Sequence, residues 1–518
     1  MNIAQILRAS VERYPDHTAL VFGYRRWTYA EWFARIERFA HGLRSLGVRP
    51  GDRVAQFLWS SEFSVTSYFA CQLLGAVCVP INHRLTATEA QFILEDSGAR
   101  VLVYGKAMTE AAMTIQRNMR ATHDFVCCAN DPTLVPSGHH HFETLAETEL
   151  DTGKLSHYAQ SSEISALVYT SGTTGQPKGV VHTHGNDTAI AMNCVMEYGL
   201  THHDTALHIA PLYHVGGMQA YFIPHLMVGG TNVVLGKYDV NKTVEVIEDE
   251  QITTMFAVPK QILDLLHTPL REGRDLSSLR LITTGGAAIT AAAMERVIRE
   301  LCPNIYNGYG LTEASLSLIL RPEDATHRLG SCGKPTLITE ARVIRQGEDA
   351  HPEERVQRGE VGQLIVRGPQ AMTAYWNRPF ATAQKLKGGW VYTGDLFSQD
   401  AEGFYFFHSR ADDMIVSGGE NIYPREVEDM LAHCPGVLDI CVIGTPDPDW
   451  GEVVTACIVR NDEHLTAQQV QDFVQSTNAL ASFKKPRKVV FLDNLPRNPS
   501  GKVVRNEILK LASEEQTS

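Results

Sequence analysis

Strand-length apolar runs alternate with helix-length amphipathic stretches along this 518-residue chain. In the first hundred residues, capping-box sequences at 28–31 and 86–89 open helical patterns, and apolar runs at 54–58, 77–81 and 101–104 separate the helical patterns. The same alternation returns at 231–260. Strands joined by helices pack as a parallel sheet with helices on both faces, so the chain is expected to have an α/β fold.

Size, charge and cysteine use narrow the functional classes. The chain is long enough for more than one domain, and its net charge of -13 argues against a nucleic acid or an anionic membrane as partner. The ten cysteines are scattered without a C-x-x-C pair, as expected of free thiols in a reducing compartment. We see no secretory signal and no apolar run of membrane-spanning length. A cytoplasmic protein without a transmembrane segment is therefore expected.

A loop rich in glycine and hydroxyl groups lies at 169–179, between two apolar runs. Glycine allows backbone N–H groups to approach an anion, hydroxyls add donors and lysine adds positive charge. These features belong to Thr170, Ser171, Gly172, Thr173, Thr174, Gly175 and Lys178. Because Lys178 follows a proline and leads into a strand, the loop differs from the P-loop. It predicts a grip on a polyphosphate; the alternative is a flexible surface hairpin.

Other short motifs follow. Tyr309, Thr312 and Glu313 place an aromatic ring, a hydroxyl and a carboxylate together, a set suited to stacking a base, contacting a phosphate and holding Mg²⁺. Asp395 ends a strand pattern and is a candidate acceptor for ribose hydroxyls. His214 lies between a proline and a glycine pair, where it is a candidate site residue. By contrast, the polar segment 130–162 is predicted to be an exposed loop. A metal site at its three adjacent histidines is the less favoured alternative, because three adjacent histidines in regular structure cannot all face one ion.

The residues that follow the polar break at 408–413 are predicted to form a separate domain. A turn-and-strand pattern at 359–368 predicts a β-rich subdomain, and the polar break at 408–413 predicts a domain boundary. Helix and strand patterns after the break predict a small α+β domain. The domain ends in basic segments at 484–488 and 496–502 within an otherwise acidic protein.

Taken in order, the motifs at 169–179, 211–217, 309–313, 392–395, 409–428 and 498–502 make the chain resemble the adenylate-forming (ANL) superfamily. This superfamily contains AMP-forming acyl-CoA synthetases, adenylation domains of peptide synthetases and beetle luciferases, and the resemblance covers essentially the whole chain. It implies an N-terminal AMP-binding domain (1–409) of two doubly wound α/β halves plus the small β-rich subdomain. It also implies a small, mobile α+β C-terminal domain (410–518) with its hinge at Asp412.

The resemblance also implies roles for individual residues. The 170–178 loop would hold the β- and γ-phosphates of ATP, Thr312 would contact the α-phosphate, Glu313 would bind Mg²⁺ and Lys502 would promote adenylation. The nucleoside would be bound by Tyr309, Asn307, Gly286, Ala287, Ala288, Asp395 and Arg410. Coenzyme A would meet Gly418, Gly419, Trp450, Lys485 and Arg487, with Arg84 as a contributor. The acyl pocket would be lined by His214, Val215, Gly216, Phe256, Gly285, Gly308, Gly310 and Ser315, with the glycines leaving it long or wide.

The implied reaction is that of a carboxylic acid–CoA ligase: carboxylate and ATP give acyl-AMP and pyrophosphate, and CoA then gives acyl-CoA and AMP. Because two anions must meet, the site has to neutralise charge. An aromatic acid of benzoate or cinnamate type and a medium- or long-chain fatty acid both remain open. The alternatives are an acyl-AMP ligase that loads a carrier protein, a luciferase and a non-catalytic nucleotide-binding protein. The oligomeric state, including a homodimer, is also open.

Overall fold

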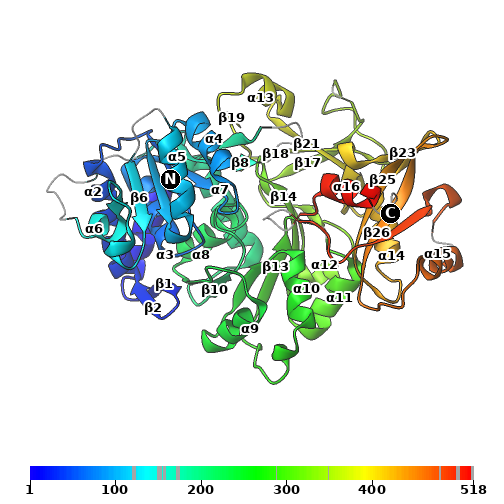
Figure 1. Cartoon of the computed structure of the whole chain (residues 1–518), viewed down its shortest axis with the longest axis horizontal. Coiled ribbons are helices and arrows are strands. Elements are labelled where there is room, and N and C mark those ends of the chain that lie inside the picture. Colours follow the sequence, from blue (N-terminus) through cyan, green and yellow to red (C-terminus); the bar gives the residue numbers. More distant parts are fainter. Residues whose placement is uncertain are drawn as a thin grey trace.

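The computed structural model describes residues 1–119, 124–148, 155, 159–170, 176–287, 289–347, 349–477, 480–497 and 502–514. Ser171, Gly172, Thr173, Thr174, Gly175 and Ala288 therefore lie outside the described residues. Four sheets are found in the described part, and Figure 1 shows the chain coloured from the blue N-terminus to the red C-terminus.

The first sheet has eight strands in the order β19-β9-β8-β4-β3-β5-β6-β7. Its strands are β3 (Arg53–Phe57), β4 (Val77–Ile81), β5 (Val101–Gly105), β6 (Asp124–Cys128), β7 (His140–His141), β8 (Ile164–Thr170), β9 (Lys178–Thr183) and β19 (Ala374–Tyr375). The strands from β8 to β7 along this order pair in parallel, whereas β8–β9 and β9–β19 are antiparallel. The polyphosphate loop thus joins an antiparallel pair at one side of the sheet.

The second sheet has nine strands in the order β16-β15-β14-β13-β12-β10-β11-β1-β2. Its strands are β1 (Thr18–Phe22), β2 (Arg25–Thr28), β10 (Thr205–His208), β11 (Thr231–Val234), β12 (Thr254–Ala257), β13 (Leu281–Gly285), β14 (Ile305–Leu311), β15 (Ser315–Leu320) and β16 (Lys334–Pro335). The five central strands, β10 to β14, are parallel. The predicted α/β fold with two wound halves is confirmed.

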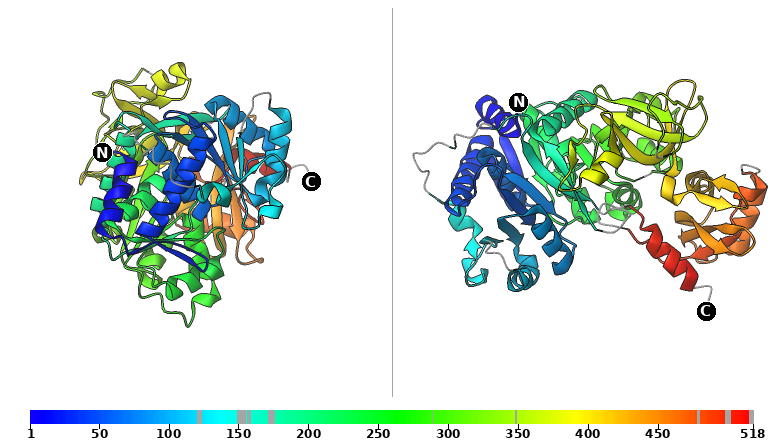
Figure 2. Two further views of the ribbon diagram at one scale, coloured as in Figure 1. Left: turned by 90° about the vertical axis from the view of Figure 1, so that its left-hand side faces the viewer. Right: turned by 90° about the horizontal axis from the view of Figure 1, so that it is seen from above.

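Helices cover both sheets (Figures 1 and 2). They are α1 (Ile3–Arg13), α2 (Tyr29–Ser45), α3 (Glu62–Leu74), α4 (Ala87–Ser97), α5 (Thr109–Asn118), α6 (Phe142–Ala146), α7 (His184–Tyr198), α8 (Ile223–Val228), α9 (Val240–Asp249), α10 (Pro259–His267), α11 (Ala291–Glu300) and α12 (Pro322–Ala325). Shorter helical turns are η1 (Lys106–Met108), η2 (Pro132–Leu134), η3 (Met218–Phe222) and η4 (Pro269–Arg271). Both predicted capping boxes form, at Thr28–Glu31 and Thr86–Glu89.

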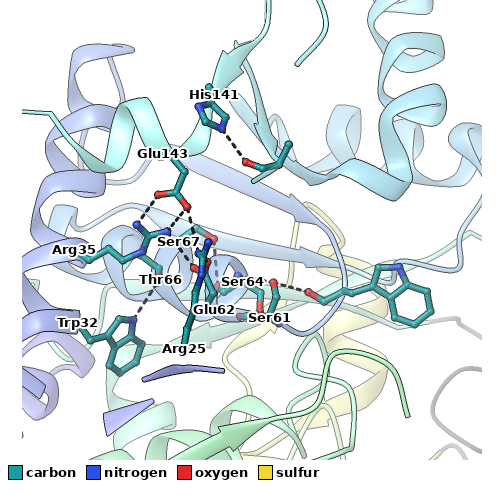
Figure 3. Close-up of polar contacts among 12 residues, drawn as sticks. Arg25, Trp32, Arg35, Ser61, Glu62, Ser64, Thr66, Ser67, His141 and Glu143 are labelled. Atoms are coloured by element: carbon teal, nitrogen blue, oxygen red, sulfur yellow. Dashed lines mark hydrogen bonds and ion pairs between the residues drawn. The ribbon is translucent and has the colours of Figure 1, made fainter. Parts of the chain in front are cut away.

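The segment predicted as an exposed loop at 130–162 is wrong in part. Within its described residues it forms β7 and α6, and Glu143 of α6 pairs with the half-buried Arg35 of α2 at 2.7 Å (Figure 3). Arg35 and Arg25 also reach Glu62, at 3.3 Å each, at the start of α3. The fully buried Phe142 stacks on Phe39, so apolar burial and paired charges hold this segment against the first half.

A third, five-stranded sheet forms the predicted β-rich unit. It contains β17 (Glu340–Ile344), β18 (Gly362–Arg367), β20 (Leu386–Lys387), β21 (Trp390–Gln399) and β22 (Tyr405–Arg410). The helix α13 (Pro379–Lys385) connects β19 of the first sheet to β20. This unit therefore lies beside the end of the first sheet that carries β9.

The C-terminal residues build their own sheet, set to one side of the rest of the chain (Figure 2, right). Its elements are η5 (Ala411–Asp413), β23 (Ile415–Ser417), β24 (Glu420–Ile422), α14 (Pro424–Leu431), β25 (Val437–Asp447), β26 (Gly451–Arg460), α15 (Ala467–Ser476), η6 (Ser482–Lys484), β27 (Lys488–Phe491) and α16 (Arg505–Glu514). The predicted boundary at 409/410 falls at the end of β22. Among the described helices, none combines the length and apolar character needed to cross a bilayer.

Candidate active site

Residues from two of the sheets meet around Glu313, in the turn between β14 and β15. The hydroxyl of Tyr375 in β19 donates to Glu313 Oε1 at 2.6 Å, and the N–H of Met372 donates to the Glu313 carbonyl at 2.8 Å. Lys178 Nζ, at the start of β9, lies 5.6 Å from the centroid of the Tyr375 ring. Burial and the adjacent Glu313 carboxylate raise the pKa of Tyr375, so its hydroxyl stays a donor. The exit of the polyphosphate loop and the predicted metal ligand therefore share one site.

The residues predicted to bind the nucleoside also come together. The Tyr309 hydroxyl donates to Asp395 Oδ2 at 2.5 Å, and Arg410 Nε lies 3.6 Å from Asp395 Oδ1 across the β21–β22 ladder. Asn307, in β14, donates through its amide to the Ser331 carbonyl at 3.1 Å. Gly286 follows β13 with a φ of +80° and is succeeded by Ala287. Gly286 follows β13, whereas Asp395 lies in the middle of β21 and does not end a strand as the sequence predicted.

His214 is brought next to the C-terminal domain. Burial, followed by the charge of Lys502 and by His83, lowers the pKa of His214 to about 4, so its ring is neutral at pH 7. Its Nε2 is buried without a hydrogen-bond partner in the described part of the chain. The charge of Lys502 is therefore near enough to His214 to oppose protonation of its ring.

The residues predicted to meet CoA form a patch on the C-terminal domain. The Arg487 guanidinium lies 4.0 Å from the centroid of the Trp450 ring, and a Cβ placed on Gly418 would lie 2.7 Å from that ring. Trp450 is 41% exposed. Gly419 has a φ of +85° and open space where a side chain would begin. Lys485 is half-buried just before Arg487.

The predicted acyl pocket shows where the glycines are needed. A Cβ on Gly285 would lie 2.5 Å from the Gly308 carbonyl oxygen, and one on Gly310 would lie 2.1 Å from the Ser315 carbonyl oxygen. At these positions the missing side chains make room for neighbouring backbone, so the expectation that they widen the pocket does not hold there. A Cβ on Gly216 would lie 3.3 Å from the Phe256 ring, and Val215 is buried beside it in sequence.

Ser315, which was predicted to line the pocket, has a strained backbone. Its φ is +47°, although it is not a glycine, and its side chain is 4% exposed. Its hydroxyl has no hydrogen-bond partner among the described residues.

Three site residues had no signal in the sequence. Tyr375 stood in an apolar run, and His182 of β9 contacts the Thr312 carbonyl only after folding. Lys385, at the end of α13, donates to the Thr393 carbonyl at 2.7 Å, two residues before Asp395. Burial lowers the pKa of Lys385, while Glu313 and Asp395 oppose that shift, so this lysine faces both carboxylates.

The donors present fit Mg²⁺ bound together with ATP. In the described ranges no three His, Cys, Asp or Glu side chains gather to form a metal cage. Proteins usually hold Mg²⁺ through one or two carboxylates together with substrate phosphates. Because Tyr375 occupies Glu313 Oε1, the other oxygen, Oε2, is the ligand atom that this arrangement would offer.

Comparison with known proteins agrees with this geometry. A family model described as "AMP-binding enzyme" matches residues 7–376, and one described as "AMP-binding enzyme C-terminal domain" matches residues 426–502. Feruloyl-CoA synthase from Amycolatopsis sp is 38% identical over 500 residues, covering 95% of this chain and 96% of the relative. The long-chain-fatty-acid–CoA ligase FadD13 of Mycobacterium tuberculosis is 34% identical over 93% of this chain and 92% of its own length.

A solved structure matches equally broadly. The anthranilate CoA ligase AuaEII in complex with anthranoyl-AMP superposes with a TM-score of 0.91 at 28% identity, covering 99% of this chain and 98% of that one. The predicted reaction class, its use of ATP, Mg²⁺ and CoA, and a small carboxylic acid as substrate are thereby confirmed. The chain belongs to the AMP-binding enzyme family and is an AMP-forming acid–CoA ligase.

Proposed function

We propose that this acid–CoA ligase activates an aromatic carboxylic acid that carries a hydrogen-bonding group on its ring. The observation that carries the proposal is the buried, unpartnered hydroxyl of Thr283 on the strand next to Phe256. Thr283 is 3% exposed and Ser315 is 4% exposed, and neither hydroxyl has a hydrogen-bond partner in the described residues. Thr283 lies in register with Phe256 on the neighbouring parallel strand, so both side chains project to the same face of the sheet.

Energetics favour such a ligand over a fatty acid. A buried hydroxyl left unpaired costs about 1–3 kcal/mol, which a substrate hydroxyl or amine would offset and an alkyl chain would not. Phe256 offers an aromatic face for ring packing. The relatives named for ferulate and anthranilate are consistent with an aromatic acid as substrate. The relative named for long-chain fatty acids represents the competing substrate class.

In the first half-reaction, a carboxylate oxygen of the acid attacks the α-phosphorus of ATP and pyrophosphate leaves. We assign the 170–178 loop to the departing phosphates and Thr312 to the α-phosphate. Lys502, whose charge is already felt at His214, is assigned to the charge that develops in the transition state. Glu313 would hold Mg²⁺, which supplies further neutralisation when bound. Tyr309, Asp395 and Arg410 would orient the nucleoside.

In the second half-reaction, the CoA thiolate attacks the acyl carbon and AMP departs. The patch of Gly418, Trp450 and Arg487 lies on the exposed side of the C-terminal domain while Lys502 acts at His214. We propose that domain 410–518 turns about Asp412 relative to domain 1–409 and brings this patch, with Gly419 and Lys485, to the CoA channel. We also propose a cytoplasmic location, because all ten cysteines are free thiols.

The proposal is tested with a panel of acids assayed with MgATP and CoA: hydroxylated and unsubstituted cinnamates and benzoates, and palmitate. We expect kcat/KM for hydroxylated aromatic acids to exceed that for the unsubstituted ones by about tenfold or more. Thr283→Val should remove that preference. Thr284→Val is the matched control, because Thr284 is also buried with an unpartnered hydroxyl but faces the other side of β13. A preference for palmitate, or an unchanged preference in Thr283→Val, would contradict the proposal.

A further inference from the structure

A buried histidine and aspartate connect the polyphosphate strand to the turn that carries Thr312. His182 of β9 and Asp187 of α7 are both 0% exposed. His182 Nε2 lies 3.0 Å from the Thr312 carbonyl oxygen, and His182 Nδ1 lies 3.1 Å from Asp187 Oδ1. The hydroxyl of Ser165, in β8, donates to the second oxygen of Asp187 at 2.6 Å.

The hydrogen-bond partners determine where the protons are. A backbone carbonyl only accepts, so His182 Nε2 carries a hydrogen and donates it to Thr312. An ionised Asp187 also only accepts, so His182 Nδ1 must carry a second hydrogen, or else the proton sits on Asp187 itself. In either form the pair is neutral as a whole, which is the condition for burying it without exposure to water. Hydrogen bonds involving a charged partner are about twice as strong as neutral ones.

The Thr312–Glu313 turn is consequently held at two successive carbonyls. His182 holds the carbonyl of Thr312, and the Met372 N–H holds the carbonyl of Glu313 at 2.8 Å. His182 lies on β9, the strand that begins at Lys178, and Met372 lies just before β19, which pairs with β9. Both contacts therefore come from the edge of the first sheet, whereas the turn belongs to the second. The relative placement of the two halves of the phosphate site depends on them.

We propose that His182 and Asp187 are a positioning pair that keeps Thr312 and Glu313 aligned with the Lys178 strand during formation of the acyl-adenylate. The proposal rests on the functions proposed above for Thr312 and Glu313. Neither residue of the pair touches a reacting atom: His182 acts through the Thr312 backbone, and Asp187 acts through His182. Removal of the Nε2 contact should slow adenylation more than it weakens binding of the acid.

Two polar substitutions separate the contacts of the imidazole. In His182→Asn the side-chain amide can take the place of Nδ1 and keep the contact with Asp187, but it is too short to reach Thr312. In His182→Gln the amide nitrogen can take the place of Nε2 and donate to the Thr312 carbonyl. His225→Asn is the control, because His225 of α8 is equally buried and also donates to a carbonyl, that of Tyr221 in η3.

The measurements are acid-dependent pyrophosphate release, the KM values for acid and ATP, and the thermal midpoint, with rates scaled to the single-turnover burst so that only folded enzyme is counted. We expect kcat for His182→Asn to fall about tenfold to hundredfold with KM for the acid changed less than about threefold. We expect His182→Gln to recover at least about a third of the wild-type rate, and His225→Asn to lower the thermal midpoint without changing kcat.

Equal kcat values for His182→Asn and His182→Gln, or a normal kcat in both, would overturn the proposal. His182 and Asp187 would then contribute only to the stability of the fold. That result is distinguishable from failure of the proposed function, which would appear as a wild-type enzyme without activity on aromatic acids.

Discussion

The hydroxyl of Tyr375 offers the sharpest test of the site around Glu313. Tyr375→Phe removes one oxygen, the donor to Glu313 Oε1 at 2.6 Å, and leaves the ring that lies against Lys178. A hydrogen bond to a charged group contributes about 1.5–3 kcal/mol. If that contribution is lost in the transition state, at about 1.4 kcal/mol per factor of ten, kcat/KM for MgATP should fall about tenfold to hundredfold.

The assay is the initial rate of acid-dependent pyrophosphate release over a range of magnesium concentrations at fixed ATP. Because Tyr375 orients the carboxylate assigned to Mg²⁺, Tyr375→Phe should need more magnesium for half-maximal rate. Tyr392→Phe is the matched control: its hydroxyl donates at 2.7 Å to the Ala350 carbonyl, and Tyr392 lies in β21 of the β-rich unit. That variant should keep the wild-type magnesium dependence.

An unchanged rate and magnesium dependence in Tyr375→Phe would refute the reasoning. Glu313→Gln then separates the causes. If Glu313→Gln is inactive, Glu313 is needed and Tyr375 does not orient it; if Glu313→Gln is active, the carboxylate is not the metal ligand.

Two more predictions concern the lysines of the site. Since burial lowers the pKa of Lys385, its charge is lost at a lower pH than that of a solvated lysine, and KM for ATP should rise on the alkaline side. In Lys385→Arg, KM for ATP should stay constant from about pH 7 to about pH 10. If KM depends on pH in the same way in Lys385→Arg and the wild type, the charge of Lys385 has no role in binding ATP. Lys502→Ala should slow pyrophosphate release by about a hundredfold while thioester formation from supplied acyl-AMP stays within a few fold. Gly419→Val should do the reverse, and equal loss of both half-reactions in either variant would refute the division of roles.

Local signals in the sequence were sufficient for the architecture. The capping boxes at Thr28 and Thr86 formed because each pairs a side chain with a backbone N–H only three residues away. The motif residues Tyr309 and Asp395 could be placed in one site only through the family resemblance, because Tyr309 lies within β14 of the second sheet and Asp395 within β21 of the third. Predictions from local patterns alone depend on contacts between residues close together in the sequence.

Contacts between distant parts of the chain could not be predicted in this way. Tyr375 reaches Glu313 because β19 pairs with β9 in an antiparallel ladder, a pairing that no local pattern announces. His182 and Thr312 are 130 residues apart in the sequence. The segment at 130–162 was misjudged for the same reason, since its polar appearance hid Glu143, whose charge is paired with Arg35 from α2. From sequence alone, a polar side chain is predicted to be exposed unless its hydrogen-bond or ion-pair partner is known.

The ion pairs around the predicted hinge restrict where the C-terminal domain can turn. Arg410 is tied to Asp395 of the N-terminal domain at 3.6 Å. Asp413 lies 3.5 Å from Arg505, which also binds Glu428 at 2.8 Å within the C-terminal domain. A rotation that preserves both sets of contacts has only the backbone of residues 411 and 412 to absorb it, which supports Asp412 as the hinge.

One contact opposes that rotation. Arg425 of α14 donates at 2.7 Å to the carbonyl of Ile289 in the N-terminal domain, where it is buried. We expect the proposed turn to break this bond and expose the guanidinium to water, so the bond favours the arrangement described above.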